Sequence, residues 1–371
     1  MKFGITPSHG NSLDTLSQGR DNNLNLLRLL AAATVLAAHS HGLTHPNEHP
    51  FEATLGMNVG DIAVDLFFVA SGFLVTNSLV KSGSVRNYAV SRMLRIYPGL
   101  WMALLLSTLV VGLAFSDLAF TDYLRQPQTW NYLLKNATML FGAEAELPGA
   151  FSLNPFPRLV NASLWTLRHE LRLYVLLGLL WVLFRALYRT PQMRQIKFER
   201  CLVAVAIILL VASEAQHAMA SHADSVHLGA MFFIGAAAYV LRRRIKLQVG
   251  WCIAGVTLLV LSANVSPMAF GAVYRIVMPY VVLYLAFGPS GRIRRFNDFG
   301  DYSYGVYIYA FPIQQMLVAS VPGIGGWGLA ASSVVTTFLA ALVSWRCIEK
   351  PALTWKIQIT KRWAGDELLH R

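Results

Sequence analysis

The residues best suited to chemistry lie inside segments that are apolar enough to cross a lipid bilayer. Residues 24–42 carry Arg28 and His39, eleven positions apart. In a helix this spacing is about three turns, so both side chains share a face and lie about 16 Å apart along the axis. Ionisable groups in a spanning helix usually face a protein interior or a water-filled cavity, which predicts a functional site. The alternative is that Arg28 reaches the headgroups and His39 simply ends the helix.

A carboxylate lies at a similar depth in the next apolar stretch, 59–80. Asp65 comes about two turns into it, and Ser71 follows near its middle. A carboxylate at that depth needs a partner, and an acid beside an imidazole commonly orients or charges it in catalysis. We therefore expect Asp65 to pair with His39. The alternative is a structural hydrogen bond between two helices.

The stretch 163–174 is rich in polar residues although it opens another apolar segment. Glu170 and Tyr174 are four positions apart and share one helix face. Packing against lipid does not explain this density of polar groups, so we expect a site near the outer face of the membrane. The candidate substrate contacts are Trp165, Arg168, Tyr174 and Ser71.

Two arginines precede the third apolar segment. Arg92 and Arg95 are three positions apart and project from one face of a helix. A pair of guanidinium groups is suited to binding phosphate oxygens in a bidentate way. The alternative is that the two cations anchor the helix at the cytoplasmic surface.

The composition is that of an integral membrane protein. Of the 371 residues, 55% are hydrophobic and only 13% are charged, about half the charge of a typical soluble domain. The three cysteines form no CxxC pair, so neither a disulfide framework nor a zinc site is indicated. The polar residues 1–23 lack the pattern of a removable signal peptide, and we expect them to be cytoplasmic.

Apolar windows long enough for a bilayer predict an all-α, multi-pass fold of about ten transmembrane helices. They form one membrane domain over residues 24–351, followed by a cytoplasmic amphipathic tail, 352–371. Glu349, Lys350 and Pro351 predict the end of the last helix. The ten expected spans are 24–44, 59–80, 97–118, 163–187, 200–214, 226–241, 248–264, 270–288, 302–320 and 324–346.

The distribution of cations sets the expected orientation. Of the 31 Lys and Arg residues, only Arg125, Lys135 and Arg158 fall in the connections assigned to the outer side. Cytoplasmic connections carry the excess of Lys and Arg, so both termini are predicted to be cytoplasmic. The net charge of +12 is then explained by membrane lipid and phosphorylated ligands, and nucleic acid is not expected as a partner.

One long connection, 116–162, lies on the predicted outer side. A loop of this length in a compact membrane domain is often a lid or a binding surface. The alternative is an amphipathic segment, such as 130–140, that lies along the membrane surface.

Six stretches match, in order, the motifs of a known family. On these motifs the chain resembles the membrane-bound acyltransferase family 3, which O-acylates bacterial surface and secreted glycans. Where many relatives have a His in the Tyr-rich motif, this chain has Ala310, so no imidazole role is carried over there. The matching stretches are Arg28 and His39 with ten residues between them, VDLFFVASGFLV (64–75), Arg92 and Arg95 followed by IYP, LWTLRHELRLY (164–174), YSYGVYIYAFP (302–312) and IEKP (348–351).

The resemblance implies an O-acetyltransferase of the bacterial cytoplasmic (inner) membrane. The donor would be acyl-CoA, usually acetyl-CoA, on the cytoplasmic side, bound as a substrate with no permanently held cofactor. The acceptor would be a hydroxyl of a glycan or lipid-linked glycan on the outer side, in a polysaccharide such as O-antigen or an exopolysaccharide.

In this hypothesis His39 is the general base on the acceptor hydroxyl, because its ordinary pKa suits proton transfer near neutral pH. Glu170 or Asp65 orients it, and a variant in which His39 is acylated as a relay nucleophile stays open. The competing classes are a polytopic transporter of an acyl group or glycan intermediate, and a non-catalytic scaffold. The candidate ligands of the CoA phosphates are Arg28, Arg92 and Arg95.

Overall fold

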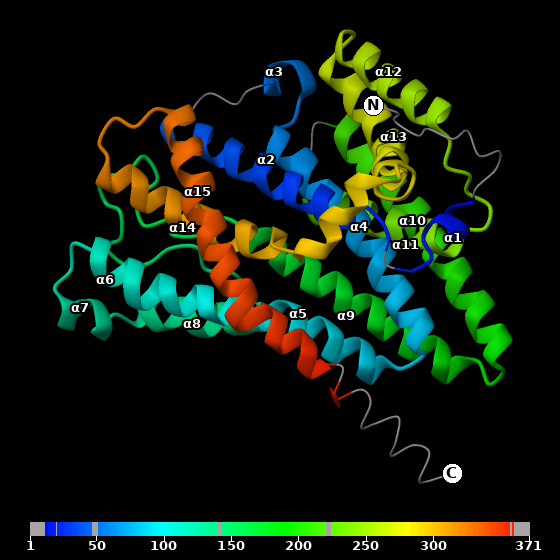
Figure 1. Cartoon of the computed structure of the whole chain (residues 1–371), viewed down its shortest axis with the longest axis horizontal. Coiled ribbons are helices and arrows are strands. Elements are labelled where there is room, and N and C mark those ends of the chain that lie inside the picture. Colours follow the sequence, from blue (N-terminus) through cyan, green and yellow to red (C-terminus); the bar gives the residue numbers. More distant parts are fainter. Residues whose placement is uncertain are drawn as a thin grey trace. The chain divides into compact units, whose positions relative to one another are not determined.

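The secondary structure of the protein is helical. The computed structural model describes residues 12–19, 21–46, 51–139, 142–219, 224–356 and 358–359 (Figure 1). Within these residues, β-structure is limited to isolated bridges such as that between Ser116 and Ala150. This confirms the all-α class. Residues 1–11 of the predicted N-terminal segment and 360–371 of the predicted tail lie outside the described part of the chain.

Among the described residues, five helices are long and apolar enough to cross a membrane, judged by length and composition, and each overlaps a predicted span. The predicted spans 226–241 and 248–264 are shorter apolar helices. The predicted spans 163–187, 200–214 and 302–320 fall on helices as well. The protein is therefore an all-helical membrane protein, while ten crossings and cytoplasmic termini stay predictions. The five are Leu24–Thr44, Val59–Ser82, Val85–Phe115, Pro267–Phe287 and Gly326–Lys356.

The chain divides into two compact units. The first comprises Met1–Ala38, His49–Lys81 and Leu179–Asp301, and the second His39–Glu48, Ser82–Gly178 and Tyr302–Arg371. Helix α2 (Leu24–Thr44) and helix α9 (Leu164–Leu187) each contribute residues to both units. Each unit is described below by itself.

The first unit is built from helices that pack in pairs. Helix α10 (Pro191–Ala218) packs on α11 (Asp224–Val240), and α12 (Val249–Ala263) packs on α13 (Pro267–Phe287). Helices α4 and α11 approach closely, since a Cβ on Gly72 would lie 1.9 Å from the carbonyl oxygen of Phe232, and one on Gly235 would lie 2.1 Å from that of Val69. The further elements are α1 (Leu13–Leu16), α3 (Glu52–Leu55), α4 (Val59–Ser82) and the 3₁₀ helix η2 (Arg292–Phe299).

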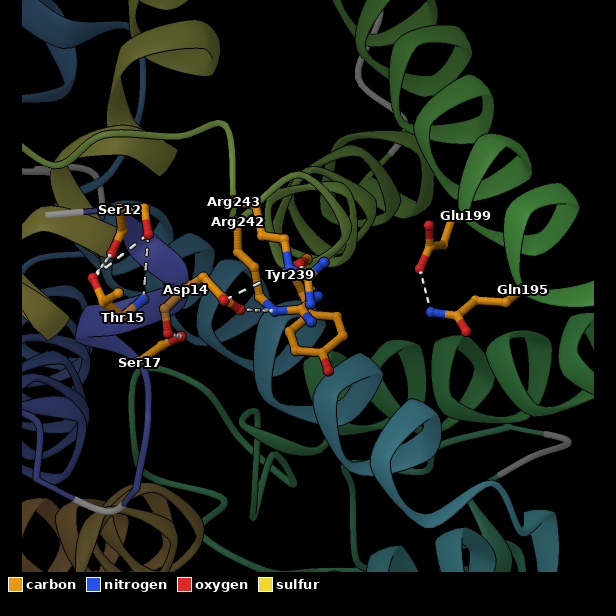
Figure 2. Close-up of polar contacts among 9 residues, drawn as sticks. All are labelled: Ser12, Asp14, Thr15, Ser17, Gln195, Glu199, Tyr239, Arg242 and Arg243. Atoms are coloured by element: carbon orange, nitrogen blue, oxygen red, sulfur yellow. Dashed lines mark hydrogen bonds and ion pairs between the residues drawn. The ribbon is translucent and has the colours of Figure 1, made fainter. Parts of the chain in front are cut away.

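The short helix α1 is fastened to the cationic turn that follows α11. The Asp14 carboxylate forms ion pairs with Arg242 and Arg243, which lie on the same side of it (Figure 2). Its Oδ1 atom is 2.6 Å from Arg242 Nε. The Arg242 guanidinium lies over the Tyr239 ring, 4.2 Å from its centroid. Leu13 is fully buried, so the α1 segment packs as part of the unit.

The second unit is organised around α14 (Ser303–Ser320), which packs against α15 (Gly326–Ser344) and α5 (Val85–Leu106). Helix α5 starts at Ser84, whose hydroxyl accepts a hydrogen bond from the Asn87 amide, and it contacts α8 and η3 as well. The further elements are the π-helical turn η1 (Ser107–Val111), α6 (Gly112–Phe115), α7 (Phe120–Arg125), α8 (Pro127–Thr138) and the π-helical turn η3 (Trp345–Glu349).

The long connection 116–162 is partly helical, and its role as a binding surface or as a segment on the membrane surface stays a prediction. Its first half forms α7 and α8, and the Trp130 indole donates a hydrogen bond to the carbonyl of Leu124. Its second half is irregular and is fastened to α14 by side chains. The Gln315 amide donates to the carbonyls of Phe156 and Leu159, at 3.0 and 2.7 Å.

The predicted helix end at Pro351 is wrong. Helical structure continues through Pro351 to Lys356, and the turn before the proline, η3, is π-helical. Proline removes one backbone donor from a helix, and helices absorb such a loss where local hydrogen bonding is irregular. Glu349 is 2% exposed in this turn, so it belongs to the interior of the second unit and not to a helix terminus.

Candidate active site

One face of α14 contacts two of the predicted site residues of the second unit, His39 and Arg95. Tyr304, Tyr307, Phe311 and Gln314 recur at intervals of three or four positions and therefore lie on one stripe of the helix. Tyr304, Phe311 and Gln314 are buried. The contacts of this stripe lead to the end of α2, the start of α9, and α5.

The His39 imidazole lies at the Phe311 end of the stripe. Its ring meets the Phe311 ring edge to face, with centroids 5.1 Å apart. The neighbouring Ser40 is fixed by the Gln314 amide, which donates to Ser40 Oγ at 2.6 Å. His39 Nδ1 is buried without a hydrogen-bond partner among the described residues. Because buried polar atoms are nearly always paired, this nitrogen marks a place where another polar group belongs.

The start of α9 packs on the middle of the stripe. Thr166 Oγ1 and the Tyr307 hydroxyl are hydrogen-bonded, and Asn161 Nδ2 donates to the carbonyl of Ile308 at 3.0 Å. The predicted substrate contact Trp165 packs edge to face on His169, with centroids 5.8 Å apart. Arg168 Nε is buried and has no hydrogen-bond partner in the described part of the chain.

The predicted pair of Glu170 and Tyr174 is confirmed as a contact. The Tyr174 hydroxyl donates to Glu170 Oε1 one turn away on α9. Tyr174 also faces α5: the Arg92 guanidinium lies 5.8 Å from the centroid of its ring, and the Tyr88 hydroxyl donates to its carbonyl at 2.8 Å. Glu170 and Arg92 thus share Tyr174 as a neighbour.

Arg95 lies at the other end of the stripe, in contact with Tyr304. Its guanidinium is 5.7 Å from the centroid of that ring, and its Nη1 atom is 3.5 Å from Glu349 Oε2. The other Glu349 oxygen accepts a hydrogen bond from Ser344 Oγ. Glu349 was not among the residues predicted for the site.

The two arginines therefore differ in their surroundings. Arg95 is held by a nearly buried carboxylate, whereas Arg92 Nε is buried with no hydrogen-bond partner among the described residues. A buried N–H group that lacks a protein partner and carries a positive charge is suited to an anionic ligand such as phosphate. The second unit thus contains a candidate anion-binding arginine on α5 and an imidazole on α2.

Three predicted site residues, Arg28, Asp65 and Ser71, lie in the first unit. Arg28 Nη1 is 2.9 Å from Asp301 Oδ2, and the guanidinium lies over the Phe67 ring, 5.7 Å from its centroid. Ser71 is buried on α4. The roles of Arg28 and Ser71 toward substrate stay predictions.

Asp65 takes two partners that the sequence analysis did not include. Its Oδ2 atom accepts hydrogen bonds from His227 Nε2 at 2.8 Å and from the Tyr274 hydroxyl at 2.9 Å. An acid–imidazole pair therefore exists, but its imidazole comes from α11. A pairing of Asp65 with His39 stays a prediction.

The residues missed by sequence reasoning had only weak signals. His227 lies near the start of an apolar helix, and Arg275 lies inside an apolar span, as the predicted residues do. Glu349 looked like a helix terminus because Pro351 follows it. Among the described residues, no group of His, Cys, Asp or Glu side chains is arranged to hold a metal ion.

Comparisons with known proteins identify the family of the chain. A family model described as an acyltransferase domain, Acyl_transf_3, matches residues 21–346. The chain is 28% identical to nodulation protein 10 of Rhizobium leguminosarum bv. viciae, over 93% of this chain and 97% of that protein. It is 25% identical to an O-acetyl transferase of Shigella phage Sf6, over 90% of this chain and 97% of that protein. No solved structure matches. The chain belongs to acyltransferase family 3 and is an O-acyltransferase of a membrane.

Proposed function

We propose that this protein transfers an acetyl group from acetyl-CoA, on the cytoplasmic side of a bacterial inner membrane, to a hydroxyl of a glycan or lipid-linked glycan on the outer side. The O-acetyl transferase of Shigella phage Sf6 is similar over nearly the whole chain, which supports acetyl as the transferred group. Because the chain is an O-acyltransferase, its polar residues inside the apolar segments are explained without the transporter or scaffold alternatives.

The observation that carries the proposal is the placement of two groups along α14. Arg95 contacts Tyr304 and His39 contacts Phe311, seven residues further on. This interval is about 10 Å along a helix axis, to which the length of an arginine side chain adds. The pantetheine arm of CoA is extended enough for a separation of this order. Phosphates on Arg92 and Arg95 would therefore place the thioester near His39.

In the proposed reaction the His39 imidazole accepts the proton of the acceptor hydroxyl. The oxygen attacks the thioester carbonyl, a C–O bond forms, the C–S bond breaks, and the proton passes to the sulfur of the leaving CoA. Glu170 lies on α9 beside Tyr174 and is the candidate in this unit to orient the imidazole or the acceptor. An acyl-histidine relay on His39 would release CoA before the acceptor binds.

The test is release of free CoA thiol from acetyl-CoA by the purified full chain, with a mixture of bacterial surface glycans. His39→Ala is expected to lower the rate by about 10²-fold or more, the usual contribution of a general base. His41→Ala is the matched control, because His41 lies on the same helix end and stacks on His45. The control variant is expected to keep the wild-type rate.

Three results would contradict the proposal. An unchanged rate in His39→Ala, with the protein still eluting as a single species in detergent, would remove His39 from the mechanism. An equal loss in His41→Ala would indicate damage to the helix end. A wild-type protein that neither binds acetyl-CoA nor releases thiol would exclude this donor.

A further inference from the structure

A second polar cluster lies in the first unit. Its residues come from the N-terminal halves of α4, α11 and α13 and from the C-terminal end of α10. We call it the Asp65 cluster. Its members are Asp65, Ser213, Glu214, His227, Tyr274 and Arg275.

One part of the cluster is a chain of hydrogen bonds. Asp65 Oδ2 accepts from His227 and Tyr274, and the other ring nitrogen of His227 lies 3.4 Å from Ser213 Oγ. Asp65 is 1% exposed, yet its Oδ1 atom has no hydrogen-bond partner among the described residues. A fully buried carboxylate oxygen is costly to leave unpaired, so a hydrogen-bond donor is expected there.

The other part is an ion pair that is far from satisfied. Arg275 Nη1 lies 3.7 Å from Glu214 Oε2, beyond hydrogen-bond distance. Arg275 Nε and Nη1, and Glu214 Oε1, are buried with no hydrogen-bond partner in the described residues. Gly271 leaves room for the side chains of this group, since a Cβ there would lie 3.1 Å from Arg275 Nη1 and 2.4 Å from His217 Nε2.

The unpaired atoms specify the chemistry of what fits. Two carboxylate oxygens need donors, while the Arg275 N–H groups need acceptors. A phosphate would satisfy Arg275 but would be repelled by Asp65 and Glu214, and a simple cation would have the opposite fault. Neutral hydroxyl groups can donate to the carboxylates and accept from the guanidinium at the same time.

The side chains of the cluster differ in how deeply they are buried. The exposed fraction falls from 28% for the Glu214 side chain and 21% for His227 to 8% for Arg275 and 1% for Asp65. A ligand would therefore enter at Glu214 and reach Asp65 last. The positive-inside rule assigns these helix ends to the outer side of the membrane, the side on which the acceptor is expected.

We propose that the Asp65 cluster binds one sugar ring of the acceptor glycan, with ring hydroxyls donating to Asp65 Oδ1 and Glu214 Oε1 and accepting from Arg275. This inference rests on the proposed function, because it assigns a place to the glycan acceptor. Asp65 then acts as a substrate-binding residue.

The test is direct binding of sugars to the purified full chain, measured by saturation-transfer NMR. The probes are the methyl glycosides of glucose, galactose, rhamnose and N-acetylglucosamine, at up to about 50 mM, well above a millimolar Kd. The variants are Glu214→Gln and Arg275→Gln, with Asp65→Asn as a third if it folds. Glu199→Gln is the matched control, since Glu199 lies on the same helix α10 and its carboxylate pairs with Gln195 at the other end (Figure 2).

The wild type is expected to bind at least one glycoside, and Glu214→Gln and Arg275→Gln to raise its Kd by about tenfold, or about 1.4 kcal/mol. Glu199→Gln is expected to bind it as the wild type does, and the Kd for acetyl-CoA is expected to be the same in all four proteins. Equal glycoside binding in the wild type and both variants would overturn the proposal and leave ordered water as the occupant. Absence of glycoside binding in the wild type would also overturn it.

The same experiment separates this inference from the proposed function. If the variants lose the glycoside but the wild type does not bind acetyl-CoA, the sugar site stands and the donor is wrong. If acetyl-CoA binds and releases thiol while the variants bind glycosides normally, the transfer reaction stands and the sugar site is wrong.

Discussion

Arg92 and Arg95 are neighbours on one helix face, but the protein uses them differently. Arg95 is partnered by Glu349, a carboxylate that is 2% exposed, and its side chain lies over Tyr304. A buried ion pair of this kind is costly to break, because the remaining charge is left without compensation. Arg92 rests on the Tyr174 ring, and its buried Nε has no hydrogen-bond partner in the described part of the chain. Arg92 is therefore the better residue for probing donor binding without disturbing the fold.

Arg92→Ala is expected to raise the KM for acetyl-CoA by about tenfold or more, since a hydrogen bond to a charged group contributes about 1.5–3 kcal/mol. The measurement is thiol release at varied acetyl-CoA concentrations. Arg86→Ala, on the exposed side of the same helix, is the control and is expected to leave KM unchanged. Equal KM values in the wild type and Arg92→Ala would exclude Arg92 from phosphate binding.

At the level of elements, the second half of the 116–162 connection behaves as a structured surface of the second unit. Four of its hydrogen bonds with α14 involve Gln315, which is fully buried. Asn154 Nδ2 donates to the carbonyl and to Oε1 of Gln315, while the Gln315 amide donates to two loop carbonyls. One side chain thus satisfies polar groups on both partners.

Gln315→Ala is expected to loosen this loop, because each buried carbonyl left unpaired costs about 1–3 kcal/mol. Limited trypsin digestion reads this out as faster cleavage after Arg158, whose side chain is exposed. Gln128→Ala, an exposed change in α8, is expected to keep the wild-type pattern. If both variants resist trypsin equally, Gln315 does not hold the loop.

The crossing of α4 and α11 depends on two glycines. Because a Cβ on Gly72 would lie 1.9 Å from a backbone oxygen, Gly72→Ala forces the two helices apart. Such overpacking is expected to cost at least about 1–3 kcal/mol and to lower the Tm of the purified protein. Gly250→Ala on α12, where no atom lies within 4 Å of the added Cβ, is the control. It is expected to leave the Tm unchanged or slightly raised, and an equal Tm for Gly72→Ala would contradict the close crossing.

The orientation in the membrane is a property of the whole molecule, and labelling experiments can test it. The cation distribution predicts that the 116–162 connection is outside and the turn after α11 inside. Both segments offer exposed side chains: Leu153 is 98% exposed, and the Arg243 side chain is 78% exposed. Labelling at these two positions can therefore test the predicted orientation.

Single cysteines at these positions, in a chain whose three native cysteines are replaced by Ser, provide the test. We expect Leu153→Cys to react with a membrane-impermeant maleimide in intact cells, and Arg243→Cys to react only after the membrane is permeabilised. The reverse pattern would invert the orientation, and labelling of both in intact cells would show that the two segments lie on one side.

The sequence by itself determined which segments are helical and which residues share a face of one helix. The pairing of Glu170 with Tyr174 and the neighbouring positions of Arg92 and Arg95 follow from spacing, because a helix fixes the geometry of residues three or four positions apart. Apolar composition likewise identified a membrane protein, and the order of the motifs identified its family.

Only the tertiary structure decided which partners each polar group has. Asp65 meets His227 and Tyr274, and Arg95 meets Glu349, although these residues are far apart along the chain. No periodicity encodes such contacts, since they depend on which helices pack together and on the depth at which they cross. Glu349 illustrates the difference: Pro351 suggested a helix end, whereas a π-helical turn carries the chain onward and packing buries the carboxylate beside Arg95. Local spacing specifies a helix, but the free energy of burying a charge is decided by the neighbours that tertiary packing supplies.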